Sequence, residues 1–300
     1  MSGKLCNLAF GALLAAALIA PSLADPVQFK GDSTVVVRDR FSDEIVGQGP
    51  DIVFIPGLAS SRETWKAEAQ RLKAHYRVHL IQVAGFAGEP SRANATGPVL
   101  VPTAEAIDAY LVEQHLAPAV VIGHSLGGTM LIYLAEHHPA DIREGMIVDS
   151  LPFYATLMAG PTATADGMKP IADKIRANSA PMDPASYDQM IKSMVSAPAD
   201  QAMIRAWGKA SDGAVIANAI ADDLTLDLRP DLPKITTKLV MLYPDYVPAG
   251  RPAGATAAMY SAAYASAPGI KLVQITNSLH FIMLDQPQQF ETALDAFLAN

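Results

Sequence analysis

The chain has 300 residues, of which 50% are hydrophobic and 17% charged, a composition typical of a folded globular protein and not of a disordered one. Its 22 Lys and Arg residues against 30 Asp and Glu give a formal net charge of −8, which leaves no basic excess for binding nucleic acid. The single cysteine, Cys6, excludes a disulfide or a cysteine-ligated metal cluster. The seven histidines lack the H-E-x-x-H spacing, so we expect no metal and no other cofactor.

The N-terminus is typical of an export signal. Lys4 precedes an apolar run over residues 8–20, and residues 22–24 offer small side chains at the two positions that a signal peptidase reads. The run is shorter than the roughly 20 apolar residues of a membrane span, and it ends at Pro21. The sequence therefore predicts a signal peptide over residues 1–24 and an exported protein, periplasmic or secreted, with no membrane span after cleavage.

Short apolar runs alternate with helical patterns along the rest of the chain. Runs of strand type lie at 35–37, 41–46, 52–55, 78–83, 120–122, 146–148, 239–243 and 270–275. Helical patterns lie at about 62–74, 103–116, 126–138, 253–265 and 287–298. Strands this short and apolar favour a mostly parallel sheet with helices on both faces. The alternation predicts an α/β fold with right-handed crossovers.

One stretch breaks this alternation, between the strand that ends at Asp149 and the strand that begins near Lys238. It has no strong strand signal, and its apolar residues follow helical spacing, for example after Asp183-Pro184, which are suited to an N-cap and a first turn. Six of the twelve methionines and Trp207 fall inside it. The sequence predicts an inserted helical unit and leaves open whether these methionines are ordinary packing or the adaptable wall of an apolar pocket.

A G-x-S-x-G motif, Gly123-His124-Ser125-Leu126-Gly127, lies between the strand at 120–122 and the helix at 126–138. A serine on such a strand-to-helix turn is typical of a nucleophile elbow. The turn strains its central residue, and side chains two positions away on either side would collide with the neighbouring strand and helix. We therefore predict that Ser125 is a nucleophile and that His124 points away from it. The alternative is a helix N-cap serine in a glycine-rich turn.

A serine hydroxyl needs a base and an acid partner for that base. His280 follows the last predicted strand, so it lies at the carboxyl end of the sheet, where functional sites gather. It is the predicted base. Asp245 follows the predicted strand at 239–243, and it is the preferred carboxylate for orienting the imidazole. Asp149 is the alternative, because it ends the strand one position closer to the elbow.

An oxyanion hole needs two N–H donors. The predicted donors are the N–H groups of Leu126, which follows the serine, and of Leu58, in the Pro56-Gly57-Leu58 turn after an earlier strand. Gly57 would let the backbone approach a substrate closely. The alternative for this segment is a plain Pro-Gly turn.

Three motifs occur in order: Phe54-Ile55-Pro56-Gly57-Leu58, the elbow followed by Gly128, and an H-F-I-M-L-D-Q-P segment that begins at His280. With them the chain resembles the α/β-hydrolase superfamily over nearly all of the mature sequence. The resemblance implies an eight-stranded, mostly parallel sheet flanked by helices, with a hydrolase core at 25–150 and 234–300 and a helical lid at 151–233. It also implies that Trp65 and the loop at 85–88 lie near the edge of the pocket.

The chain departs from the family pattern at one turn, because Tyr243-Pro244-Asp245-Tyr246 is shorter than the acidic turn that family members often carry after strand seven. Because serine and not aspartate occupies the elbow, the resemblance argues against the chemistry of haloalkane dehalogenases and epoxide hydrolases, which use an aspartate nucleophile there.

We therefore expect an exported serine hydrolase that cleaves a carboxylic ester of a small molecule through a covalent acyl-enzyme. The same residues could open a lactone, cleave an amide or peptide, or break a carbon–carbon bond beside a ketone. An alternative of another class is a catalytically silent ligand-binding protein of the same fold. The apolar helices of the inserted unit suggest a substrate with an apolar moiety.

Overall fold

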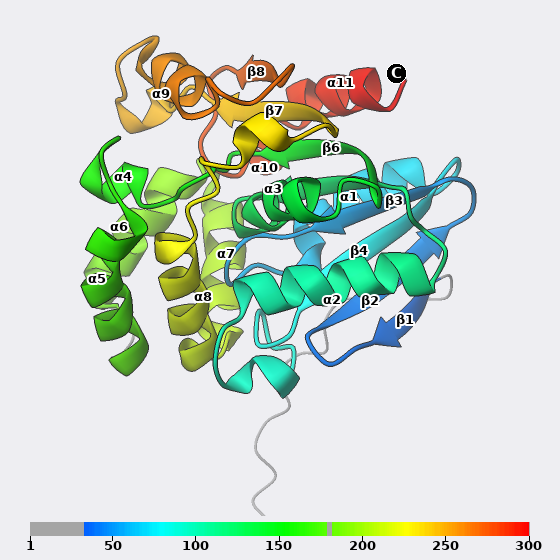
Figure 1. Cartoon of the computed structure of the whole chain (residues 1–300), viewed down its shortest axis with the longest axis horizontal. Coiled ribbons are helices and arrows are strands. Elements are labelled where there is room, and N and C mark those ends of the chain that lie inside the picture. The colour runs from blue at the N-terminus through cyan, green and yellow to red at the C-terminus, as the bar shows by residue number, and fades with distance from the viewer. Residues whose placement is uncertain (1–32, 179–181, 300) are drawn as a thin grey trace, which may run out of the picture.

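The computed structural model describes residues 33–178 and 182–299 (Figure 1). The predicted signal peptide over residues 1–24 lies outside the described residues. Within the described part of the chain, no helix is both long and apolar enough to cross a membrane.

In the described residues, eight strands form one sheet in the order β1-β2-β4-β3-β5-β6-β7-β8. The strand pairs β1/β2 and β2/β4 are antiparallel, and all other neighbours are parallel. Each of the eight predicted runs overlaps one strand, so the predicted α/β fold with a mostly parallel sheet is confirmed. The strands are β1 (Ser33–Val37), β2 (Phe41–Gly47), β3 (Asp51–Ile55), β4 (Arg77–Val83), β5 (Ala119–His124), β6 (Ile142–Val148), β7 (Lys238–Pro244) and β8 (Lys271–Ile275).

Helices cover both faces of this sheet (Figure 1). Strand β3 shows why its sequence is apolar throughout. Side chains alternate between the two faces of a strand, so Val53 and Ile55 enter one core while Ile52 and Phe54 enter the other. The first core contains α2 (Leu100–Glu113), α3 (Leu126–His137) and α9 (Ala255–Ala263), and the second contains α1 (Lys66–Leu72), α10 (Ile282–Asp285) and α11 (Pro287–Leu298).

Five helices occupy the stretch between β6 and β7 for which the sequence predicts helices. They are α4 (Thr156–Ala159), α5 (Ala165–Ala177), α6 (Pro184–Met194), α7 (Pro198–Ala210) and α8 (Gly213–Thr225). Backbone hydrogen bonds join them to the loop after β4, from Gly88 N–H to Ala210 and from Asp212 N–H to Gly85. Another joins Phe281 N–H, after β8, to the carbonyl of Met194. The helical insertion therefore lies over the carboxyl edge of the sheet, and its function as a lid stays a prediction.

The inserted helices begin partly as predicted. Asp183 is the N-cap of α6 and accepts hydrogen bonds from the N–H groups of Ala185 and Ser186, with Pro184 in the first turn. Among the six methionines, Met168 is buried in a small core between α5 and α8, whereas Met158 and Met182 are more than half exposed. Packing in a core therefore accounts for Met168 and does not account for Met158 and Met182.

The helix predicted at 103–116 begins three residues earlier, at Leu100. The reason is a long-range cap. Asp222 of α8 accepts hydrogen bonds from the N–H groups of Val99 (2.6 Å) and Leu100 (3.1 Å). A carboxylate in this position satisfies two of the free N–H groups at a helix start and is favoured by the helix dipole. The helix predicted at 62–74 instead opens with a 3₁₀ turn over Arg62–Trp65 before α1.

Three further 3₁₀ turns complete the described elements, and one of them lies at the end of the stretch between β6 and β7. They are η2 (Arg92–Ala95), η3 (Leu232–Lys234) and η4 (Val247–Ala249). The last of these follows β7 directly, so it belongs to the same edge of the sheet as the candidate site.

Candidate active site

Ser125 occupies the turn between β5 and α3, with φ 53° and ψ −120°, a strained conformation for a residue other than glycine. Its N–H donates to the carbonyl of Val148 at the end of β6 (2.9 Å), which ties the turn to the neighbouring strand. Its side chain makes no capping hydrogen bond to α3, although the residue stands at the N-cap position. Ser125 is partly exposed, and its hydroxyl does not cap the helix, whereas the alternative of an N-cap serine would require such a hydrogen bond.

The glycines around Ser125 are required by close backbone contacts. A Cβ atom at Gly123 would lie 2.2 Å from the carbonyl oxygen of Gly127, and one at Gly127 would lie 2.5 Å from that of Ile55. At Gly128 it would lie 2.7 Å from Ser150 Cβ. These distances are far below van der Waals contact with groups that cannot move aside, so the spacing of the motif has the predicted steric cause.

The structure brings His280 together with Asp149 and not with Asp245. The Nδ1 atom of His280 lies 2.6 Å from Oδ2 of Asp149, and the side chains are 15% and 2% exposed. Asp149 directly follows β6, which pairs with β5, the strand that leads to Ser125. The preferred assignment of Asp245 as the partner of His280 is therefore wrong, and the alternative, Asp149, makes the contact.

Asp245 is occupied elsewhere, which explains the error. Its carboxylate accepts hydrogen bonds from the N–H groups of Asn277 (2.8 Å), Ser278 (3.3 Å) and Val247 (3.1 Å). These contacts fix the short turn after β7 to the loop that carries His280. Asp245 thus binds backbone N–H groups of the histidine loop. The imidazole of His280 instead contacts Asp149, which follows the neighbouring strand β6.

Two tyrosine hydroxyls share the Asp149 carboxylate with His280. Tyr246 donates to Oδ2 (2.7 Å) and Tyr260 donates to Oδ1. Burial, and then the negative charge of Asp149, raises the pKa of each phenol well above its ordinary value, so both remain protonated donors. No sequence signal distinguishes them, because Tyr246 lies in an irregular turn and Tyr260 resembles a core residue of α9.

His124 lies beneath the histidine loop. Its Nε2 donates to the backbone carbonyl of His280 (3.1 Å), and the centres of the two rings are 4.5 Å apart. The side chain is fully buried, which lowers its pKa well below the ordinary value, with a further contribution from His280. A neutral His124 therefore supports the loop without adding charge beside His280.

Trp65 is fully buried, with its ring edge-on to that of His124 at 6.3 Å. It packs between Phe54 and Phe290 in the core below the elbow. The expectation that it lies at the edge of the pocket is therefore wrong, because its surroundings are core residues.

The Pro56-Gly57-Leu58 turn lies against the elbow. A Cβ atom at Gly57 would be 3.1 Å from Cβ of Ser125, so a side chain there would crowd the serine. Leu126 is the first residue of α3, where backbone N–H groups have no acceptor within the helix. The two predicted donors, Leu58 and Leu126, thus belong to segments that meet at Ser125.

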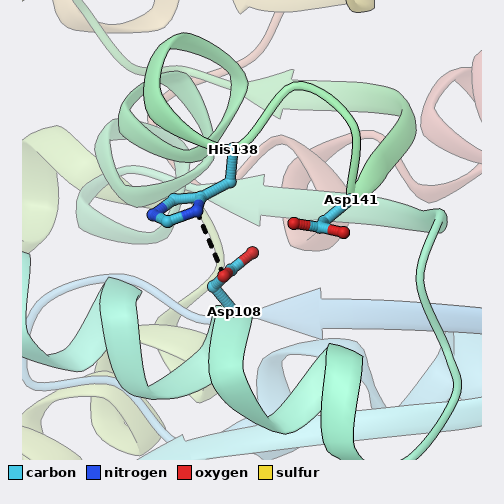
Figure 2. A group of neighbouring side chains, drawn as sticks. All are labelled: Asp108, His138 and Asp141. Carbon is cyan, nitrogen blue, oxygen red and sulfur yellow. Dashed lines mark ion pairs between the residues drawn. The ribbon is translucent and has the colours of Figure 1, made fainter.

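One group of described side chains has the geometry to hold a metal ion, namely Asp108, His138 and Asp141, whose ligand atoms lie within 4.8 Å of one another (Figure 2). His138 Nδ1 is 3.2 Å from Asp108, and its Nε2 is 3.1 Å from Glu105. His138 follows the C-terminus of α3, whereas Ser125 precedes its N-terminus. Twelve helical residues, about 18 Å, separate the two, so this group takes no part in chemistry at Ser125.

Comparison with known proteins identifies the family of the chain. A model of the alpha/beta hydrolase family matches residues 52–293. A pimeloyl-[acyl-carrier protein] methyl ester esterase of Vibrio vulnificus is 30% identical over 109 residues, which are 36% of this chain and only 40% of that protein. An esterase of the same name from Aeromonas hydrophila is 26% identical over 270 residues, covering 86% of this chain and 98% of the relative.

Among solved structures, an esterase from Exiguobacterium antarcticum is similar with a TM-score of 0.71 and 19% identity, over 87% of this chain and 96% of that one. At this identity the likeness concerns the fold. The family match covers most of the chain, including the elbow and the histidine loop. The chain belongs to the alpha/beta hydrolase family.

Proposed function

We propose that the protein is a serine hydrolase that cleaves carboxylic ester bonds of small molecules. The observation that carries this proposal is the pairing of His280 with the buried carboxylate of Asp149 at the edge of the sheet where Ser125 stands on its strained turn. A buried carboxylate that accepts Nδ1–H leaves Nε2 of the imidazole free to take a proton. A ligand-binding protein without turnover would not need this arrangement.

In the proposed reaction, Ser125 Oγ attacks the ester carbonyl carbon while His280 Nε2 takes its proton. Asp149 holds the resulting imidazolium, and the N–H groups of Leu58 and Leu126 bind the oxyanion. The tetrahedral intermediate expels the alcohol, which receives the proton from His280. Water then attacks the acyl-Ser125 with His280 again as the base, and the acid leaves as Ser125 recovers its proton.

An ester substrate is favoured by the relatives. Two curated relatives are named as methyl ester esterases, and one of the similar solved structures is an esterase. Lactone, amide and carbon–carbon bond cleavage use the same nucleophile and base, so they are outcomes that substrate tests must separate.

We also propose that the substrate has an apolar moiety. Tyr154, Leu157 and Met158 follow β6 soon after Asp149, and they are 36%, 48% and 59% exposed. Exposed apolar side chains in the segment that follows the candidate acid are suited to contact an apolar group of a ligand. Export remains part of the proposal on the evidence of residues 1–24 alone. Equal turnover of charged and apolar esters would contradict the apolar moiety.

The proposal is tested with an alkyl fluorophosphonate, which traps an activated serine, followed by peptide mass mapping. We expect one modification at Ser125, lost in Ser125→Ala and strongly slowed in His280→Ala. Short p-nitrophenyl esters should be turned over faster than aminoacyl p-nitroanilides. Absence of labelling together with absence of ester hydrolysis by the folded parent protein would overturn the proposal.

A further inference from the structure

We infer that Tyr246 and Tyr260 are positioning residues, which hold the Asp149 carboxylate in the orientation that allows it to orient His280. The inference rests on the proposed function. It assigns a role in the reaction to the turn after β7 and to α9, neither of which carries the nucleophile, the base or the acid.

The carboxylate of Asp149 has a specific partner on each side. Oδ2 accepts from His280 Nδ1 (2.6 Å) and from Tyr246 Oη (2.7 Å), whereas Oδ1 accepts from Tyr260 Oη. Asp149 is 4% exposed. An ionised carboxylate has about four acceptor sites and is costly to bury without donors. His280 supplies one donor, so the two phenols supply the other hydrogen bonds seen here.

The backbone of Asp149 makes this support necessary. Asp149 has φ 47°, a left-handed conformation that a residue with a side chain rarely adopts, and its N–H is held by the carbonyl of Leu242 on β7. The side chain therefore leaves β6 in a fixed direction. Rotation about its own Cα–Cβ and Cβ–Cγ bonds is then limited by Tyr260 on one oxygen and by Tyr246 on the other.

Each tyrosine is itself fixed by a separate element. The N–H of Tyr246 donates to the carbonyl of Ser278 (3.1 Å), two residues before His280, and the guanidinium of Arg251 lies 5.4 Å from the centre of its ring. Tyr260 stacks on Tyr243 of β7 at 4.9 Å. The position of the acid is thus set by β7, α9 and the histidine loop together.

The other ionisable groups near this cluster do not replace the two phenols. His124 faces His280 and is neutral because burial lowers its pKa, and Tyr264 donates to the carbonyl of Ser150 (2.9 Å) and not to Asp149. Arg251 and Tyr154 influence the pKa of Tyr246 but form no hydrogen bond with Asp149 in the described structure. Tyr246 and Tyr260 are therefore the hydroxyl donors whose removal acts directly on the acid.

The test compares Tyr246→Phe, Tyr260→Phe and the double variant with Tyr264→Phe on a p-nitrophenyl ester. Each of the first two should lower kcat by about 10- to 100-fold and leave KM nearly unchanged, because a hydrogen bond to a charged acceptor is lost away from the substrate. Tyr264→Phe also removes a buried hydroxyl, the one that donates to the carbonyl of Ser150. This variant should keep the parent kcat.

The pH profile separates positioning from simple loss of stability. With fewer donors, the Asp149 carboxylate is a stronger base and stabilises the imidazolium form of His280 more. The acidic limb of kcat/KM should therefore move to higher pH in both phenylalanine variants. Replacing Tyr260 with 3,5-difluorotyrosine keeps its shape and makes it a stronger donor, so the limb should move to lower pH in a protein that still folds.

The outcomes distinguish this inference from the proposed function. If the parent hydrolyses the ester and is labelled at Ser125, but the Tyr246 and Tyr260 variants keep its kcat and acidic limb, the inference is overturned. Equal losses in Tyr246→Phe, Tyr260→Phe and Tyr264→Phe with no change of the limb would also overturn it. A parent protein that is neither active nor labelled would instead refute the proposed function.

Discussion

Two aspartates near His280 carry different kinds of hydrogen bond. Asp149 accepts from the imidazole, whereas Asp245 accepts from three backbone N–H groups of the adjoining turn and loop. Replacing the two by asparagine removes the same charge in each case. The difference between the two variants therefore measures what each carboxylate does.

We predict that Asp149→Asn lowers kcat by on the order of 10³- to 10⁴-fold, because an amide can present an N–H to Nδ1 and favour the wrong tautomer of His280. Asp245→Asn should lower kcat about 10-fold or less and should reduce thermal stability, since one oxygen that accepts from Asn277 N–H is replaced by a donor. Steady-state kinetics and thermal unfolding check both. A loss of activity in Asp245→Asn as large as that in Asp149→Asn, with a stable fold, would contradict the assignment.

At the scale of elements, the helical insertion and the core are joined by a helix cap. Oδ2 of Asp222 on α8 accepts from Val99 and Leu100 at the start of α2, while Oδ1 accepts from Arg176 of α5 (2.8 Å). One side chain thus links two inserted helices to a helix of the core. Its loss should weaken α2 at its first turn and leave the other end of that helix unaffected.

We predict that Asp222→Ala lowers the free energy of unfolding by about 1–2 kcal/mol, as expected for loss of a cap. The matched control is Arg176→Met, which leaves the cap in place and removes the partly exposed ion pairs of Arg176 with Asp222 and Asp173, and it should cost less than about 0.5 kcal/mol. Urea unfolding measures both values, and hydrogen exchange locates the change. Equal destabilisation by the two variants would mean that the ion pair, and not the cap, is the stabilising contact.

At the scale of the whole molecule, stability should depend on buried carboxyl groups. Glu68 of α1 is 1% exposed, and burial raises its pKa from 4.5 to about 7, with a smaller contribution from Glu291. Below pH 4.5 the group is protonated in both the folded and the unfolded chain. As the pH rises towards 7, only the unfolded chain ionises, so the free energy of unfolding falls.

We predict that Glu68→Gln raises the free energy of unfolding by about 1–3 kcal/mol at pH 8 and has little effect at pH 4.5. The control is Glu113→Gln, whose side chain is 58% exposed and which should change neither value appreciably. Denaturant unfolding across this pH range provides the measurement. A gain from Glu68→Gln that is the same at both pH values would show that ionisation of Glu68 is not its cause.

Local chemistry explains how much the sequence predicts about this molecule. The apolar runs of β3 and β5 are strand signals because both faces of the sheet are covered, and the glycine at 123 follows from its close contact with Gly127, four residues along the chain. The position of His280 after the last strand places it at the carboxyl edge once the sheet is parallel. These features depend on neighbours in sequence, and they determined the fold class, the elbow and the histidine loop.

The tertiary structure alone decided which acid meets His280, which tyrosines hold that acid, and where α2 begins. Asp149, Tyr246 and Tyr260 come from three segments whose side chains converge only when β6, β7 and α9 are packed, and the cap of α2 comes from α8, more than 120 residues away. Asp149 and Asp245 each follow a parallel strand, so spacing treats them alike. The path of the loop that Asp245 binds turns the imidazole towards Asp149, and that path is set by contacts between residues distant in sequence.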